Sequence, residues 1–170
     1  MSTQHRLTLA YCEQHLPDLD LERIRLSIDF FEEIDKLRCG LLQIAELSGL
    51  QVGRFYILRM LFVSPEQSLL PSVLAEALGV ARASISKQLD ILEQQGMVER
   101  RINPEDRRSV YVQLTPAGAE FMRRELPLYL QRVDRGLTEF ETTQFSAVVA
   151  QLRRVQLGIE RELSGVNEQA

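Results

Sequence analysis

Apolar residues recur at steps of three and four along the first 63 positions of the chain, a spacing typical of helices with one buried face. The longest helix predicted in this way carries Leu21, Ile24, Ile28, Phe31, Ile34, Leu37, Leu41 and Ile44 on one side. Asp18 or Asp20 is expected to cap its start. A shorter amphipathic segment around Leu7, Leu9 and Tyr11 precedes it, and a further helix is predicted over residues 52–63.

Two short helices joined by a glycine-containing turn are predicted next. Ser72 is expected to cap a helix over residues 73–78, and Gly79 suits the left-handed backbone that ends such a helix. The buried stripe of the second helix is predicted to be Ile85, Leu89 and Leu92. Two helices in this arrangement form a helix-turn-helix.

A β-hairpin follows the second short helix. Gly96 ends that helix, residues 97–102 and 110–114 have strand patterns, and Asn103-Pro104 opens the turn between them. Thr115-Pro116 then starts a helix that extends towards Leu137. The last helix is predicted from about residue 142, and its apolar face consists of Phe145, Val148, Val149, Leu152, Val155, Ile159 and Leu163.

These elements predict a mainly α fold with a small β-hairpin wing, of the α+β kind. Residues 49–115 form the winged helix-turn-helix, residues 1–48 are amino-terminal dimerisation helices and residues 116–170 are carboxy-terminal dimerisation helices, all in one intertwined structural domain. The dimer is expected because a small wing domain does not easily cover the long apolar faces of the first and last helices. A monomeric bundle that packs those helices on each other is the alternative.

Composition excludes several classes of protein. The 170 residues contain 45% hydrophobic side chains, enough for a core, and no apolar run approaches the roughly 20 residues of a membrane helix. A cytoplasmic protein with no membrane contact is therefore expected. The chain has two histidines and two cysteines, and it lacks a glycine-rich phosphate loop or a catalytic triad. We expect no enzyme activity, no metal site and no bound cofactor.

Charge is distributed unevenly. The formal net charge is -4, and residues 1–50, with five basic and nine acidic side chains, hold all of that deficit. Between positions 100 and 108, four arginines face only Glu105 and Asp106. This local excess of arginine suits contact with phosphate, although a solvated hairpin with internal ion pairs would have the same composition.

The second short helix has side chains that suit the major groove of DNA. Its buried stripe leaves the opposite face for a partner, and short polar, lysine and glutamine side chains on that face can contact bases and phosphates. A merely solvated helix face is the alternative. The residues predicted to contact DNA from this helix are Arg82, Ser84, Ser86, Lys87 and Gln88.

Four segments in this order and spacing resemble the MarR family of bacterial transcriptional regulators. The first is Leu74-Ala75-Glu76-Ala77-Leu78-Gly79-Val80, followed by the run from Ser84 to Arg100. The others are Asn103-Pro104-Glu105-Asp106-Arg107-Arg108 and Leu114-Thr115-Pro116-Ala117-Gly118. The resemblance spans about positions 50 to 120. It implies a homodimer that binds double-stranded DNA at a near-palindromic operator, most often as a ligand-responsive repressor.

The resemblance also implies roles for individual residues. Arg108 is expected to enter the minor groove, and Arg107 and Arg101 to contact the DNA backbone. Asp106 and Asp90 are expected to orient the wing, and Asp90 matches a helix acid of the family that can pair with a wing arginine. The chain departs from the family pattern at Ala81. The second short helix, which is the recognition helix of the family, therefore begins without a side-chain cap, and this costs about 1 kcal/mol.

Members of the MarR family commonly respond to small aromatic acids or to oxidants, and the chain has candidate residues for both signals. Arg38, Phe55, Tyr56 and Arg59 are predicted to line an effector pocket, although such residues are more often core. Cys39, beside Arg38, and Cys12 are the candidate redox residues, although a helical cysteine is usually inert. A winged helix that binds protein instead of DNA is the remaining alternative, and the acidic first 50 residues would suit it.

Overall fold

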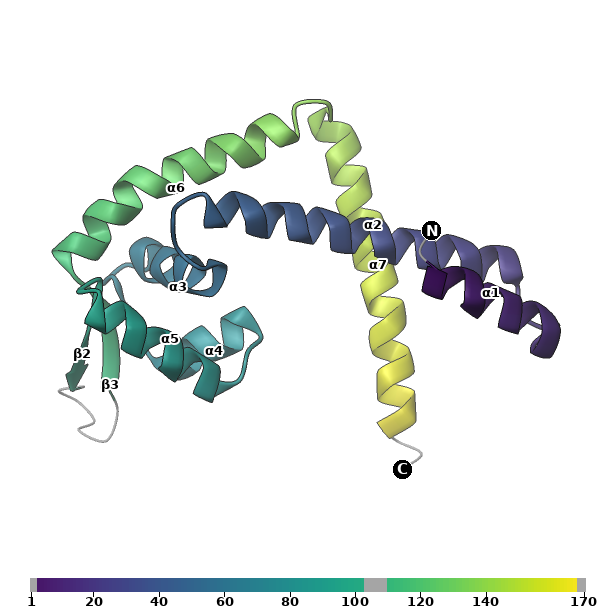
Figure 1. The fold of residues 1–170 in the computed structure, drawn as a ribbon, viewed down its shortest axis with the longest axis horizontal. Helices are drawn as coiled ribbons and strands as arrows, with labels where there is room; N and C mark the ends of the chain where they lie inside the picture. Colours follow the sequence, from purple (N-terminus) through teal and green to yellow (C-terminus); the bar gives the residue numbers. More distant parts are fainter. Residues whose placement is uncertain (1–2, 103–109, 168–170) are drawn as a thin grey trace. The chain divides into compact units, whose positions relative to one another are not determined.

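The computed structural model of the chain describes residues 3–102 and 110–167. The chain divides into two compact units, Met1–Tyr129 and Leu130–Ala170. The first contains helices α1 to α5, a three-stranded sheet and the start of α6, and the second contains the end of α6 and α7 (Figure 1). Within the described ranges, no helix has the length and apolar character needed to cross a membrane.

Helices α1 (Thr3–His15) and α2 (Leu21–Glu46) pack against each other in the first unit. The start of α2 is capped by Asp20, whose side chain accepts a hydrogen bond from the Arg23 backbone N–H at 3.0 Å. On α1, Cys12 is 7% exposed. The two predicted helices are confirmed, and of the two candidate caps the structure uses Asp20.

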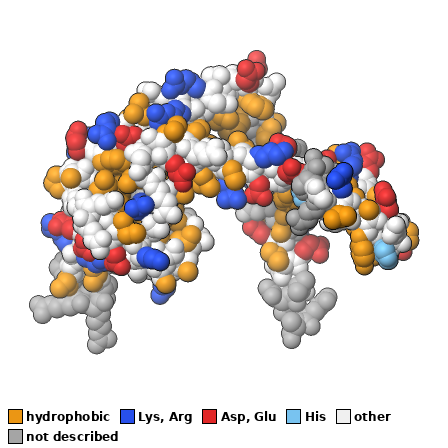
Figure 2. Space-filling view, viewed as in Figure 1, with side chains coloured by type: hydrophobic (Ala, Val, Ile, Leu, Met, Phe, Trp, Pro, Cys, Tyr) orange, Lys and Arg blue, Asp and Glu red, His pale blue; other side chains and the backbone are white. Residues whose placement is uncertain are grey.

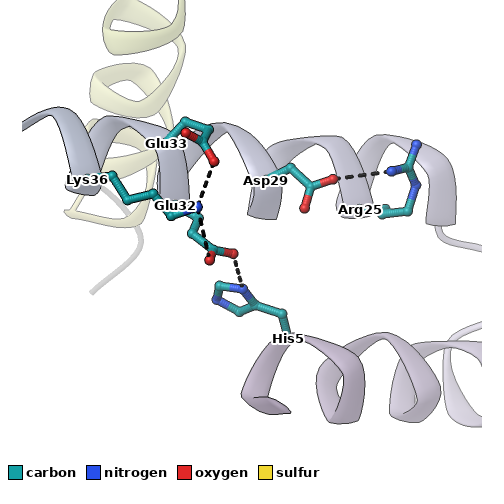
Figure 3. Close-up of polar contacts among 6 residues, drawn as sticks. All are labelled: His5, Arg25, Asp29, Glu32, Glu33 and Lys36. Atoms are coloured by element: carbon teal, nitrogen blue, oxygen red, sulfur yellow. Dashed lines mark hydrogen bonds and ion pairs between the residues drawn. The ribbon is translucent and has the colours of Figure 1, made fainter. Parts of the chain in front are cut away.

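A polar contact also joins α1 to α2. The Nδ1 atom of His5 lies 3.1 Å from Oε2 of Glu32, and Lys36 pairs with Glu33 at 2.7 Å and with Glu32 at 3.5 Å (Figure 3). Desolvation opposes ionisation of Glu32, but the hydrogen bond with His5 and the positive charge of Lys36 outweigh it, so the pKa of this carboxyl lies below its ordinary value. Glu32 is therefore ionised at neutral pH.

Helix α3 (Val52–Val63) supplies the centre of the core. Phe55, Ile57, Leu58 and Leu61 are fully buried. The helix contacts α2, α4, α5 and strands β1 and β3. Because α3 touches all these elements, it connects the long amino-terminal helix to the helix-turn-helix.

Helices α4 (Pro71–Leu78) and α5 (Arg82–Gln94) form the predicted helix-turn-helix. Gly79 adopts φ 63°, and the Val80 backbone N–H donates to the Ala75 carbonyl at 3.0 Å, which closes α4 as expected. The prediction that Ser72 caps α4 is wrong. The helix begins at Pro71, with Leu70 at the cap position, because the fixed φ of Pro71 suits the first helical residue.

The wing belongs to a three-stranded antiparallel sheet of order β1-β3-β2. Strands β2 (Val98–Ile102) and β3 (Val110–Leu114) pair from Val98 opposite Leu114 to Ile102 opposite Val110. The edge strand β1 (Ser68–Leu69) pairs with β3 and was not predicted, because two residues carry no detectable alternation. The predicted mainly α fold with a small β wing is confirmed.

Thr115 fixes the start of helix α6 (Pro116–Gly136). Its hydroxyl accepts a hydrogen bond from the Gly118 N–H at 3.1 Å and donates to the Gly96 carbonyl at 2.7 Å. Its backbone N–H donates to the Met97 carbonyl at 3.1 Å. The predicted cap is confirmed, and the same residue also ties α6 to the turn that follows α5.

The division between the two units falls inside α6, after Tyr129. Tyr129 belongs to the first unit, where it is 7% exposed and its ring lies 5.1 Å from that of Phe55. In the second unit, none of the described side chains of α7 (Thr142–Asn167) is buried. The separate roles predicted for residues 1–48, 49–115 and 116–170 stay a prediction.

Candidate nucleic-acid interface

Helix α5 presents one polar face to solvent because its other face is held in the core. Ile85, Leu89 and Leu92 are at most 2% exposed, as the sequence predicts. The residues on the exposed side include Arg82, Ser84, Ser86 and Lys87. Four of the five side chains predicted to contact DNA from this helix therefore lie on an accessible surface.

The fifth of these side chains, Gln88, is not exposed like the other four. Its side chain is half-buried and lines a cavity between α5 and the neighbouring helices. Its Oε1 atom is buried and has no hydrogen-bond partner among the residues that the structure describes. The pattern of apolar residues did not reveal this, because Gln88 is adjacent to the buried Leu89 and turns towards α3. Its predicted contact with DNA stays a prediction.

The start of α5 carries no side-chain cap. Ala81 occupies the cap position and makes no side-chain hydrogen bond, as expected. The first-turn N–H groups of an uncapped helix can bind an anion, and the partial positive charge of the helix end favours one. Arg82, the first residue of the helix, is exposed at the same place. This end of α5 therefore suits a phosphate group.

The arginines of strand β2 lie in ion pairs. Arg101, predicted to contact the DNA backbone, has its Nη2 atom 2.6 Å from Oε1 of Glu99. Arg100 has its Nη2 atom 2.5 Å from Oδ1 of Asp90 and also pairs with Glu93, both on α5. The predicted wing-tip residues Asp106, Arg107 and Arg108 lie outside the described residues.

Asp90 thus contacts an arginine of the wing. The sequence did not predict that this arginine is Arg100 or that Glu93 shares the contact. The side-chain hydrogen bond with Asp90 and the nearby Glu93 charge raise the pKa of Arg100, against desolvation. The signal was present in the strand pattern: Arg100 is two residues after the buried Val98, so both side chains lie on the same face of β2. The interpretation of Asp90 as a wing-orienting residue stays a prediction.

The residues predicted to form an effector pocket are only partly brought together. Arg38 and Tyr56 line the cavity of about 310 Å³ that also includes Ser84 and Gln88 of α5. Phe55 is 0% exposed and packs in the core, and Arg59 lies with its Cζ atom 4.7 Å from the centre of the Tyr56 ring. The complete lining of this cavity is Arg38, Leu42, Val52, Gly53, Tyr56, Ile57, Leu78, Val80, Ser84, Ile85 and Gln88.

Tyr56 is a neutral hydroxyl in this cavity. Burial and a hydrogen bond with Tyr129 raise the pKa of Tyr56 to about 12. The two candidate redox residues are both free thiols, Cys12 buried and Cys39 exposed. Among the described side chains, no group of three or more His, Cys, Asp or Glu could hold a metal ion.

Comparison with known proteins identifies the family. The model of the MarR family matches residues 50–110, which include α3, the helix-turn-helix and strand β2 of the wing. The HTH-type transcriptional repressor YetL of Bacillus subtilis is 27% identical over 150 residues, covering 88% of this chain and 86% of YetL. The chain therefore carries a MarR-family domain. It is thus a transcriptional regulator and not an enzyme, as its sequence predicts.

Other transcriptional regulators match to different extents. The transcriptional repressor MprA of Escherichia coli K12 is 39% identical over 79 residues, which are 46% of this chain and 45% of MprA. Sco3205 of Streptomyces coelicolor, solved in complex with DNA, has a TM-score of 0.70 at 24% identity, covering 82% of this chain and 88% of Sco3205. A mutant form of E. coli MarR, solved with operator DNA, has a TM-score of 0.65 at 25% identity, covering 79% of this chain and 95% of that protein.

Proposed function

We propose that this MarR-family regulator binds a near-palindromic DNA operator as a homodimer and represses transcription. The observation that carries the proposal is the exposed polar face of α5, with Arg82, Ser86 and Lys87 opposite the buried Ile85 and Leu89. The repressor names of YetL and MprA and the DNA held by Sco3205 and E. coli MarR support it.

The exposed apolar face of α7 supports the homodimer. Its exposed large side chains are Phe145, Val148, Val155, Leu157, Ile159 and Leu163, each at least 39% exposed. Most of these residues follow the three- and four-residue steps of a helix that packs lengthwise on another helix. Apolar surface along α7, which ends at the grey carboxy-terminal residues, is visible in Figure 2. A second copy of this chain would cover this face.

Salt dependence of binding separates DNA recognition from the alternative of a protein-binding winged helix. A duplex selected from a random pool is titrated with the protein at several salt concentrations. Each phosphate neutralised contributes about -0.9 to the slope of log affinity against log salt, so a steep slope is expected. The Arg82→Met variant should have a slope shallower by about 2, because a homodimer loses one phosphate contact in each subunit. A flat dependence for the unaltered protein would favour the protein-binding module.

Repression is tested separately from binding. A reporter promoter that contains the selected duplex should be less active when the protein is present. Arg82→Met should restore part of the activity, because it weakens operator binding. Higher activity in the presence of the unaltered protein would show an activator and contradict this part of the proposal.

We further propose that the cavity between α2, α3, α4 and α5 binds a small aromatic acid that controls operator binding. The Arg38 guanidinium, which also pairs with Asp35 at 3.2 Å, would bind the carboxylate. The apolar side chains Leu42, Ile57 and Ile85 suit a ring, and Tyr56 stays uncharged beside the anion. Ser84 and Gln88 place part of the recognition helix on the same cavity. A bound acid would therefore contact α5 directly.

Phenolic acids titrated against a labelled operator complex test the effector site. Arg38→Met should raise the acid concentration needed for half release about tenfold or more, because it removes the partner of the carboxylate. Arg25→Met is the matched control, since Arg25 lies on the same helix and pairs with Asp29 at 3.2 Å. Equal release from both variants would contradict this site.

Thiol oxidation is the alternative signal, and it has a direct test. The Cys12→Ser and Cys39→Ser double variant is exposed to peroxide, and its operator binding is compared with that of the unaltered protein. If oxidation is the signal, the double variant loses the response. A response that is unchanged in the double variant would remove the redox role of both residues.

A further inference from the structure

The Arg100 side chain joins strand β2 of the wing to α5, the recognition helix, through ion pairs. Its two terminal nitrogens pair with Asp90 and Glu93, and its backbone N–H donates to Glu93 Oε1 at 3.2 Å. Asp90 and Glu93 are three residues apart on α5, so they lie on the same side of that helix. Three contacts from one residue of β2 therefore bind it to about one turn of α5.

The Arg100 ion pairs lie at the outer end of the contact between β2 and α5. Val98, Arg100 and Ile102 share one face of β2. Val98 is 2% exposed, the Arg100 side chain 33% and Ile102 67%. Among the described residues, Arg100 therefore makes the outermost ion pairs between β2 and α5, at the point where the apolar packing ends.

The main chain makes a tight turn where α5 leads into the wing. The turn between α5 and β2 contains Gly96 at φ 69°, and the Met97 N–H donates to the Leu92 carbonyl at 2.9 Å. Beyond Val98, no further apolar side chain of this face is buried within the described part of β2. Val112 of β3, which lies opposite Arg100, is fully buried, so the packing of β3 and the side-chain contacts of Arg100 together fix the angle between the wing and α5.

The charges show that Arg100 is not arranged as a phosphate contact. Its guanidinium is shared by two carboxylates, so the three side chains carry a net charge of -1 and would repel an approaching phosphate. Arg82 differs, because it is exposed and has no ion pair with another described residue. Exposed ion pairs contribute little stability, so the contacts of Arg100 act mainly on orientation.

We propose that Arg100 is a positioning residue: held by Asp90 and Glu93, it sets the angle of the wing so that wing and recognition helix contact one DNA half-site together. The inference rests on the proposed operator binding. It assigns to strand β2 a role separate from direct contact with DNA.

The test compares two arginine variants on the selected duplex. Arg100→Met keeps most of the side-chain stem and removes the charge. It should lower operator affinity about tenfold with the salt slope of the unaltered protein, because no phosphate contact is lost. Arg82→Met is the control and should make the slope of the homodimer shallower by about 2. Thermal unfolding of Arg100→Met should stay close to that of the unaltered protein.

A charge exchange supplies the second arm. Arg100→Glu places three carboxylates together and should weaken binding more than Arg100→Met. Adding Glu93→Arg restores one cation between two acids and should recover most of the affinity. A shallower slope for Arg100→Met, unchanged affinity, or no recovery in the exchange would overturn the inference. Failure of the unaltered protein to select any duplex would instead contradict the proposed function.

Discussion

Replacing Gly118 by alanine should destabilise the first unit by about 3 kcal/mol or more. A Cβ atom at this position would lie 2.2 Å from the Met97 carbonyl oxygen and 2.9 Å from Cδ1 of Leu114. The first contact is with backbone, which does not move away as a flexible side chain can. The Met97 carbonyl also accepts the Thr115 N–H, so any shift would disturb the start of α6.

Chemical denaturation of the purified protein measures this effect. Gly40→Ala is the matched control, because Gly40 lies inside helix α2 and a Cβ there meets no atom within 4 Å. This control should raise stability by up to about 1 kcal/mol, the difference in helix propensity between the two residues. Equal denaturation midpoints for Gly118→Ala and the unaltered protein would contradict the close packing of α6 on the turn after α5.

Replacing Ile159 by glutamate should abolish the homodimer at micromolar concentration and operator binding with it. Ile159 is 44% exposed on α7, so in a monomer the change would alter stability by little. In a dimer the same position would be covered, and burying an unpaired carboxylate costs several kcal/mol. The dimer dissociation constant should therefore rise about a hundredfold or more.

Ala150→Glu is the control for Ile159→Glu. It lies nine residues earlier on the same helix and hence on the opposite side, at about 100° per residue, and it is exposed. It adds the same charge but should leave the dimer intact. Light scattering across a range of concentrations gives the oligomeric state of both variants. A monomeric unaltered protein, or a dimeric Ile159→Glu, would show that this face of α7 is not the dimer interface.

The parts of the fold that could be predicted have local causes. The left-handed glycines at 79 and 96 end α4 and begin the wing, and the stripe of Ile85, Leu89 and Leu92 fixes which face of α5 is buried. The capping hydroxyl of Thr115 sets the start of α6. Each of these effects acts within a few residues along the chain, so the sequence pattern is sufficient to predict it.

The parts that were missed depend on tertiary contacts. Strand β1 exists because two residues pair with β3, and so short a segment has no periodicity of its own. Gln88 turns towards α3, whereas Ser84, Ser86 and Lys87 of the same helix are exposed, and the hydrophobic pattern contains no information about a single polar side chain. The Arg100 contact joins residues ten positions apart, and only the pairing of wing and helix brings them together.

Selection of bound duplexes from a random pool by the unaltered protein, followed by sequencing, tests the proposed function most directly. A homodimer that places two α5 helices in successive major grooves should enrich a pair of inverted half-sites whose centres are about 10 base pairs apart. Enrichment of a single half-site without its inverted copy, or of no sequence at all, would contradict the account.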